Sequence, residues 1–213
     1  MLQTKIRKDV QTLVANPQPE FVKRRQVGIL GGNFNPVHNT HLILADQVGR
    51  LLGLDQVYLM PEFLPPHVDE KTTIAPEHRL RMLQLAIEGN PLLAIEPIEL
   101  QRQGKSYTYE TMKELRERHP DTDYYFIIGG DMVEYLPKWH KVDELMQLAQ
   151  FVGVRRPGYP EISDYPLMWV DVPLMDLSST MIRQKVAQGC SIRYYVPEAV
   201  RDYIEEKGLY LDE

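Results

Sequence analysis

The feature that most constrains the fold of this chain is a short apolar run that ends in two glycines before an amphipathic segment. The spacing predicts a buried strand at Val27–Leu30, a turn at Gly31-Gly32 and a helix from about Asn39. Glycines let the backbone approach an anion, and free N–H groups at a helix start point toward it. His38 and His41, three positions apart, share one face of this helix. We therefore expect a phosphate site to which both histidines contribute donors.

The rest of the chain continues to alternate between strands and helices. Such alternation favours a parallel sheet covered on both faces, whose ligands bind beyond the carboxyl ends of the strands. The predicted fold class is α/β, a Rossmann-like, doubly wound parallel sheet with helices on both faces, in a single domain at 26–213. We expect strands at 56–60, 123–128, 151–154 and 167–172, a partly extended segment at 93–100, and helices near 39–52, 76–88, 107–119, 142–148, 179–187 and 197–207.

The first 25 residues form a separate element in this interpretation. Leu2, Ile6, Val10 and Leu13 recur at helical spacing, and Asn16-Pro17-Gln18-Pro19 then interrupts the pattern. We predict a helical extension at 1–25 that packs on the surface of the domain. The alternative is a contact between copies of the chain, which would make the protein a homo-oligomer.

Composition excludes several classes of function. The formal net charge of −6 argues against nucleic acid as a partner. The single cysteine, Cys190, rules out a disulfide framework within the chain and a cysteine-based zinc site. No run approaches the roughly 18 apolar residues of a membrane span, and the charged N-terminus has no hydrophobic signal core. We therefore expect a cytoplasmic protein that binds neither membrane nor nucleic acid.

A second candidate functional segment lies near the end of the chain, at Ser178-Ser179-Thr180-Met181-Ile182-Arg183. A serine before an apolar-periodic run is typical of a helix N-cap, and a capped helix is the simpler interpretation. The alternative is a second helix start directed at phosphates, with a planar cationic fork from Arg183. The histidine pair is equally open, because it could be structural or could supply two metal ligands, although no third ligand lies close in sequence.

Taken together, these two segments resemble the nucleotidyltransferase superfamily, which has an H-x-G-H motif after a glycine turn and a late S-x-T-x-x-R motif. The resemblance runs from about Val27 to about Leu209. Within the superfamily, the chain most resembles the bacterial nicotinate mononucleotide adenylyltransferases. The intervening motifs that carry it are Pro65-Pro66-His67, Ser106-Tyr107-Thr108, Ile127-Ile128-Gly129-Gly130-Asp131-Met132, Leu136-Pro137-Lys138-Trp139 and Gly153-Val154-Arg155-Arg156-Pro157.

This resemblance implies transfer of AMP from ATP to nicotinate mononucleotide, with release of pyrophosphate, on the route to NAD. It implies Mg²⁺ accompanying ATP, with no dedicated protein metal site. The implied catalytic residues are His38, His41 and Arg183. Contacts with ATP are implied for Gly31, Gly32, Asn33, Phe34, Gly129, Asp131, Ser179 and Thr180 as well, and contacts with the mononucleotide for Tyr107, Thr108, Trp139 and Arg156, with Arg155 the alternative to Arg156.

The chain departs from the family pattern at several positions. Asn33 stands where Ser or Thr is usual, Asn35 replaces a common Asp, Thr40 replaces the glycine of H-x-G-H, and Val68 follows His67 where Lys is usual. Two alternatives follow, a transferase of the superfamily with another acceptor, such as phosphopantetheine, and a nucleotide-binding regulatory module. Because donors arranged for a carboxylate are poor partners for an amide, we expect preference for the acid substrate over the amide.

Overall fold

The computed structural model describes residues 23–64, 73–155, 162–173 and 175–212, with the backbone alone at Asp131. The predicted extension at 1–25 lies outside these residues except for its last three. Arg25 already belongs to the first strand, one residue before the predicted start of the domain. Arg24, which precedes this strand, pairs with Asp123 at 2.7 Å.

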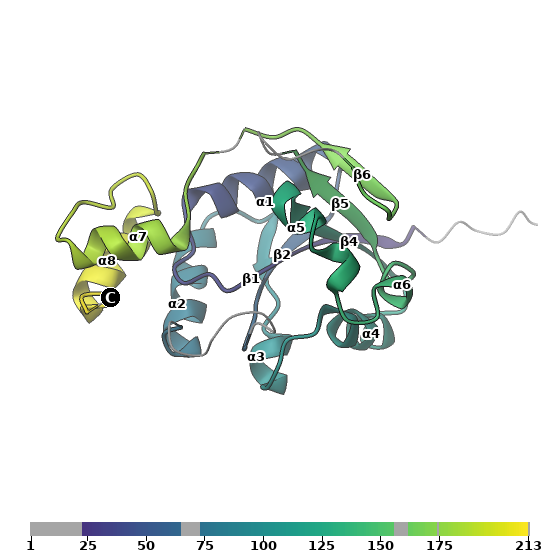
Figure 1. Ribbon diagram of the computed structural model, residues 1–213, viewed down its shortest axis with the longest axis horizontal. Helices are drawn as coiled ribbons and strands as arrows, with labels where there is room; N and C mark the ends of the chain where they lie inside the picture. The colour runs from purple at the N-terminus through teal and green to yellow at the C-terminus, as the bar shows by residue number, and fades with distance from the viewer. Residues whose placement is uncertain (1–22, 65–72, 156–161, 174, 213) are drawn as a thin grey trace, which may run out of the picture.

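A single sheet of six parallel strands organises the described residues, in the order β3-β2-β1-β4-β5-β6 (Figure 1). This confirms the predicted doubly wound α/β fold. The order reverses between β1 and β4, the point at which open parallel sheets bind their ligands. The strands are β1 Arg25–Gly32, β2 Gln56–Pro61, β3 Leu93–Ile95, β4 Thr122–Gly129, β5 Gln150–Val154 and β6 Leu167–Val170.

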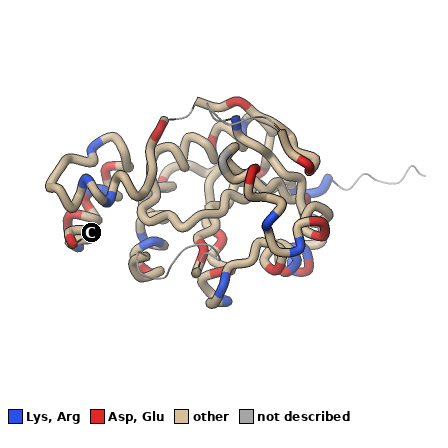
Figure 2. The backbone as a smooth tube through the Cα atoms, viewed as in Figure 1, with Lys and Arg blue, Asp and Glu red and all other residues tan. Residues whose placement is uncertain are grey.

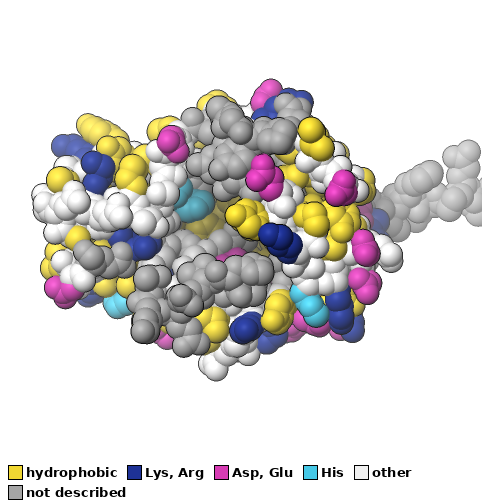
Figure 3. Space-filling view, in the orientation of Figure 1, with side chains coloured by type: hydrophobic (Ala, Val, Ile, Leu, Met, Phe, Trp, Pro, Cys, Tyr) yellow, Lys and Arg dark blue, Asp and Glu magenta, His cyan; other side chains and the backbone are white. Residues whose placement is uncertain are grey.

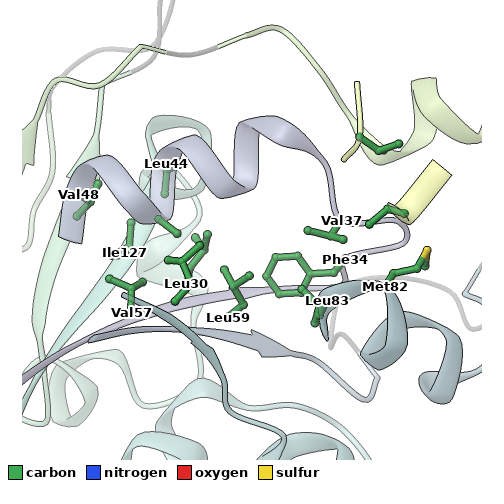
Figure 4. Close-up of a cluster of buried hydrophobic side chains, with 14 of the residues drawn as sticks. Leu30, Phe34, Val37, Leu44, Val48, Val57, Leu59, Met82, Leu83 and Ile127 are labelled. Atoms are coloured by element: carbon green, nitrogen blue, oxygen red, sulfur yellow. The ribbon is translucent and has the colours of Figure 1, made fainter. Parts of the chain in front are cut away.

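The sheet is buried on both faces because neighbouring side chains along each strand point to opposite sides. Leu30 and Ile127 belong to one hydrophobic core, which Figure 4 shows between the sheet and α1. Ile29 and Phe126 belong to a second core on the other face. Two cores, one on each side of the sheet, account for the nearly continuous apolar runs of the central strands.

Each core is closed by its own set of helices (Figure 1). The helices of the first core are α1 Asn39–Leu51, α2 Pro76–Ile87, α7 Ser179–Ala187 and α8 Glu198–Lys207. The short segments of the second are α3 Ile98–Arg102, α4 Thr108–Arg118, α5 Gly130–Val133, the 3₁₀ helix η2 Leu136–Lys138, and α6 Val142–Leu145. Among the described helices, none is long and apolar enough to cross a membrane.

The predictions missed the short helices. The segment 93–100 is partly extended, as expected, at β3, but β3 ends at Ile95 and the unexpected helix α3 follows it. Pro97 precedes the first turn of α3, and Ile98 is buried in the second core. α5 and η2 were not expected at all, because three or four residues are too few to display a helical period. These short helices matter because they form one side of the candidate site.

Candidate active site

The turn between β1 and α1 is built around Gly32 and Phe34. Phe34 has a φ of 49° and folds its ring back onto the strand end. A Cβ added at Gly32 would lie only 3.3 Å from that ring, so a glycine is needed for this packing. The Phe34 side chain is 1% exposed and belongs to the core. The expected contact of Phe34 with ATP is therefore not available to its side chain and is left to its backbone.

The two histidines at the start of α1 lie against one another. Their ring centroids are 3.6 Å apart and the rings are stacked, with the Phe34 ring packed edge-on at 5.0 Å from His41. The backbone N–H of His38 donates to Nδ1 of His41 over 3.2 Å. An accepting Nδ1 assigns the proton of neutral His41 to Nε2. His41 is thus oriented to offer one N–H donor away from its own backbone.

Burial keeps this pair uncharged in the free protein. It lowers the pKa of His38 to about 4. It also lowers the pKa of His41 well below the ordinary value, and repulsion from His38 adds to that effect. Nδ1 of His38 is buried without a hydrogen-bond partner among the described residues. At neutral pH the site therefore presents two neutral imidazoles rather than two cations.

The late serine–arginine segment meets this turn. Ser178 is the N-cap of α7 and accepts a hydrogen bond from the Met181 N–H at 3.2 Å, as the simpler interpretation predicted. The Ser179 hydroxyl donates to the Pro36 carbonyl at 2.9 Å. Arg183 donates from Nη1 to the Asn35 carbonyl at 3.1 Å. Two segments more than 140 residues apart in sequence thus form one structure, which we call the phosphate end (Gly31–His41 and Ser178–Arg183).

Three residues that depart from the family pattern have specific hydrogen bonds here. Asn33 receives two hydrogen bonds from Nη1 of Arg79, one at its carbonyl (2.9 Å) and one at its side-chain oxygen (3.1 Å). Asn35 accepts from the Tyr210 hydroxyl at 2.8 Å. Thr40 donates to the Met175 carbonyl at 3.2 Å, which ties α1 to the segment before α7. Sequence reasoning did not identify Arg79, which is fully buried and also donates to the Glu62 carbonyl.

A cavity of about 560 Å³ opens beside the phosphate end, at the carboxyl ends of β1, β2 and β4. Figure 3 shows the central hollow on this face of the molecule. Of the predicted site residues, the cavity brings together Gly31, Gly32, Tyr107, Thr108, Gly129 and Trp139.

Trp139 forms one wall of the cavity and packs against the second core. Its ring packs edge-on against Phe126 at 5.9 Å and against Phe151 at 6.2 Å. Opposite elements supply Tyr107, the N-cap of α4, and Thr108, its first residue. The Tyr107 ring contacts the His140 ring at 4.8 Å. An aromatic wall facing a helix start suits a flat ring that carries a hydrogen-bonding substituent.

Sequence reasoning missed three charged residues of the cavity: Glu62, Glu99 and Lys138. Glu62 directly follows β2, so the rule that ligands bind beyond strand ends could have indicated it. Glu99 lies in α3, at the end of the segment 93–100 for which only a partly extended conformation was predicted. We call the cavity walls formed by Glu62, Glu99, Ser106–Thr108 and Trp139 the pyridine end, after the ligand that the sequence resemblance implies there.

Several predicted residues lie outside the part of the chain that the structure describes. These are Arg156, the motif Pro65-Pro66-His67, Val68 and the side chain of Asp131. Arg155, the alternative to Arg156, is described, and its guanidinium is paired with Asp171 at 2.9 Å. Thr180 is exposed at the start of α7.

Comparison with known proteins agrees with this geometry. The cytidylyltransferase-like family model matches residues 29–185. A protein named "Probable nicotinate-nucleotide adenylyltransferase" from Enterococcus faecalis is 66% identical over 97% of this chain and 94% of its own length. Its namesake from Streptococcus pneumoniae is 64% identical over 91% of this chain and 93% of its own length. The chain belongs to the nicotinate-nucleotide adenylyltransferase family.

Solved structures of more distant proteins share the fold of this adenylyltransferase. Nicotinic acid mononucleotide adenylyltransferase from Plasmodium falciparum, complexed with APC, superimposes with a TM-score of 0.74 at 20% identity, over 87% of this chain and 97% of that one. The same protein complexed with NaAD gives a TM-score of 0.73 at 21% identity over the same shares. The chain is thus a nucleotidyltransferase with the Rossmann-like architecture that its sequence predicted.

Proposed function

We propose that this adenylyltransferase joins ATP and nicotinate mononucleotide across the cavity, with the triphosphate at the phosphate end and the nicotinate ring at the pyridine end. A phosphate oxygen of the mononucleotide forms a bond to the α-phosphorus of ATP as the bond to the β-phosphate oxygen breaks. Nicotinate adenine dinucleotide and pyrophosphate result. The observation that carries this proposal is the pair of hydrogen bonds from Ser179 and Arg183 to the loop before His38.

The phosphate end acts by positioning and by stabilising charge, because the mononucleotide phosphate is already a nucleophile. His38 and His41 would donate N–H groups to the α-phosphate and the departing pyrophosphate. Arg183, Ser179 and Thr180, at the start of α7, would hold the β- and γ-phosphates. The backbone at Gly31 and Gly32 would approach the triphosphate, with further backbone contacts from Asn33 and Phe34.

Neutral histidines give this end a specific response to its ligand. Two stacked imidazolium ions would repel each other, and burial already disfavours their charge. Bound phosphates favour the protonated form of an imidazole, so the histidine pair would take up protons when ATP binds. The pair would then carry positive charge only when a phosphate is present to balance it.

Mg²⁺ would enter as part of the MgATP substrate. The described residues hold no group of three His, Cys, Asp or Glu that could form a metal site. Mg²⁺ retains waters and binds phosphate oxygens readily, so it needs few protein ligands. The ion would neutralise charge on the leaving pyrophosphate.

At the pyridine end, Trp139 would stack on the nicotinate ring, while Tyr107 and Thr108 would meet its carboxylate. The cavity volume falls within the usual range for small-molecule sites. Gly129 and Asp131 would border the adenosine, at the end of β4. Arg156 remains our choice for the mononucleotide phosphate.

The proposal is tested by measuring pyrophosphate release from ATP and Mg²⁺ with three acceptors: nicotinate mononucleotide, nicotinamide mononucleotide and phosphopantetheine. We expect release with nicotinate mononucleotide at a kcat/KM well above the other two. Faster release with phosphopantetheine would assign the chain to another acceptor. ATP binding with no release for any acceptor would instead indicate a regulatory module.

A further inference from the structure

Two carboxyl groups on the cavity wall have no role in the reaction described above. Glu62 follows the last residue of β2, and Glu99 lies in the first turn of α3 with 2% of its surface exposed. Both line the same cavity. Figure 2 shows acidic positions (red) gathered where α3 meets the sheet. Carboxylates are unexpected neighbours for a substrate that carries a carboxylate and a phosphate.

The two groups differ in how they are held. Glu99 accepts a hydrogen bond from the Thr111 hydroxyl at 2.7 Å, and Arg102 lies 4.0 Å from the same oxygen. Glu62 has its backbone fixed, since its N–H donates to the Gly32 carbonyl and its carbonyl accepts from Arg79. Within the described residues, no hydrogen bond or ion pair engages the carboxyl of Glu62. The carboxyl of Glu62 is therefore available to respond to a ligand.

The protonated and ionised forms of Glu62 are both populated near neutral pH. Burial and the neighbouring Glu99 raise the pKa of Glu62 to about 7, with Arg79 opposing the shift. Burial also raises the pKa of Glu99, against hydrogen bonds from Thr111 and Ser106 and the charge of Arg102. The other groups of the cavity that carry or can gain charge are Lys138 and His140.

Glu62 is also joined to the segment expected to read the pyridine substituent. The Phe63 N–H donates to the Ser106 hydroxyl at 3.0 Å, and the Ser106 N–H donates to the Leu64 carbonyl at 3.0 Å. The chain after Glu62 therefore runs alongside the chain that leads into Tyr107 and Thr108. A charge on Glu62 lies beside the wall where an acid and an amide must be distinguished.

We propose that Glu62 is a specificity-determining residue whose protonation state sets how strongly the cavity prefers the anionic pyridine mononucleotide over the neutral amide. This inference rests on the proposed function. A protonated Glu62 leaves the wall uncharged and can donate an O–H to the substrate carboxylate. An ionised Glu62 repels that carboxylate but does not repel an amide. Binding of the acid substrate is then coupled to retention or uptake of one proton by Glu62.

The test is the ratio of kcat/KM for nicotinate mononucleotide to that for nicotinamide mononucleotide, between pH 6 and pH 8. The substrate phosphate, ATP and the histidine pair titrate alike for both acceptors, so their effects cancel in the ratio. We expect the ratio in the wild-type protein to fall by about tenfold over this range. In Glu62→Gln it should not change with pH.

Glu96→Gln is the matched control. Burial also raises the pKa of Glu96, which caps the N–H of Ile98, but Glu96 does not line the cavity. Its ratio should follow the wild-type curve. A Glu62→Gln protein that keeps the wild-type pH dependence would overturn the inference. So would a wild-type ratio that does not depend on pH, whereas no pyrophosphate from either mononucleotide would overturn the proposed function itself.

A second measurement uses the wild-type protein alone, in case Glu62→Gln does not fold. Calorimetry at pH 7.5, in two buffers of different ionisation enthalpy, counts the protons taken up when each mononucleotide binds. We expect greater uptake with nicotinate mononucleotide than with nicotinamide mononucleotide. Equal uptake for the two would contradict the role of Glu62.

Discussion

The phosphate end and the pyridine end solve opposite electrostatic problems. In the proposed binding mode the phosphate end receives a polyanion, yet its two histidines are uncharged, because burial lowers the pKa of both and repulsion from His38 lowers the pKa of His41 further. In the same binding mode the pyridine end receives a carboxylate, yet it contains Glu62, and burial and the neighbouring Glu99 raise the pKa of Glu62. At both ends, burial favours the uncharged form of these side chains in the free protein, and the proposed ligand changes which form is favoured. The two proposals together predict that ligand affinity depends on proton uptake as well as on fixed charge.

The largest effect should come from the phosphate end. Substituting His41 by Ala removes a donor at developing negative charge, and we expect kcat to fall by about 10²–10³-fold with little change in KM for nicotinate mononucleotide. Steady-state kinetics measure this effect. His78→Ala is the control, because His78 pairs with the Tyr203 hydroxyl between α2 and α8 and does not belong to the phosphate end. A His41→Ala kcat close to that of His78→Ala would contradict the catalytic role.

The pyridine end should respond through binding. Trp139→Ala removes a stacking surface worth roughly 1–3 kcal/mol, so KM for nicotinate mononucleotide should rise about 10- to 100-fold while KM for ATP changes little. Trp139→Phe keeps an aromatic face and should recover most of this loss. Because Trp139 also packs against Phe126 and Phe151, the melting temperature of each variant must be compared. Equal changes in both KM values would remove the distinction between the two ends.

Protein stability should respond to pH in opposite directions at the two ends. The folded pKa of His38 lies below its unfolded value, so stability is lost as pH falls from about 6.5 to about 4. The folded pKa of Glu62 lies above its unfolded value, so stability is lost as pH rises from about 4.5 to about 7. In Glu62→Gln this loss is absent. The unfolding free energy of the variant should therefore rise more steeply with pH than that of the wild type between pH 4.5 and 6.5, by about 1.4 kcal/mol per pH unit.

Urea unfolding at several pH values measures that slope. Between pH 6.5 and 7.5 the unfolding free energy of the Glu62→Gln protein should stay level, whereas that of the wild-type protein should fall until Glu62 is fully ionised. Glu96→Gln provides the comparison for loss of a carboxyl outside the cavity. Parallel curves for wild-type and Glu62→Gln proteins would mean that Glu62 does not titrate near neutral pH.

The smallest effect should be at Thr40, where the family pattern has glycine. Thr40→Gly removes the hydrogen bond to Met175 and adds backbone freedom in the first turn of α1, so we expect a loss of about 1 kcal/mol in unfolding free energy. The change in kcat should remain within about twofold. Thr40→Ser, which keeps the hydroxyl, is the matched control. A large gain in kcat for Thr40→Gly would mean that the threonine methyl obstructs the nucleotide.

Local patterns were sufficient for most of the fold. Helix α7 begins and ends at the predicted residues, since Ser178 caps it and its apolar spacing is regular. Helix α3 was missed because only five residues form it after Pro97. For the site, the glycine turn and both histidines were found from motifs. Arg79 was not, because nothing in its sequence neighbourhood predicts complete burial next to Asn33.

The sequence by itself determined the order of the strands and the longer helices and the glycine turn, and it pointed to the residues that we propose bind phosphate, because backbone preference and side-chain period act over a few neighbouring positions. The tertiary structure decided which distant groups meet and how much water each keeps. Only folding brings Arg183 within hydrogen-bonding distance of the Asn35 carbonyl. Folding also buries the stacked rings of His38 and His41, and it places Glu62 close enough to Glu99 for the two carboxyl groups to interact. Those outcomes depend on burial and on distances between separate elements, and desolvation of a charge is a property of the assembled interior rather than of any segment.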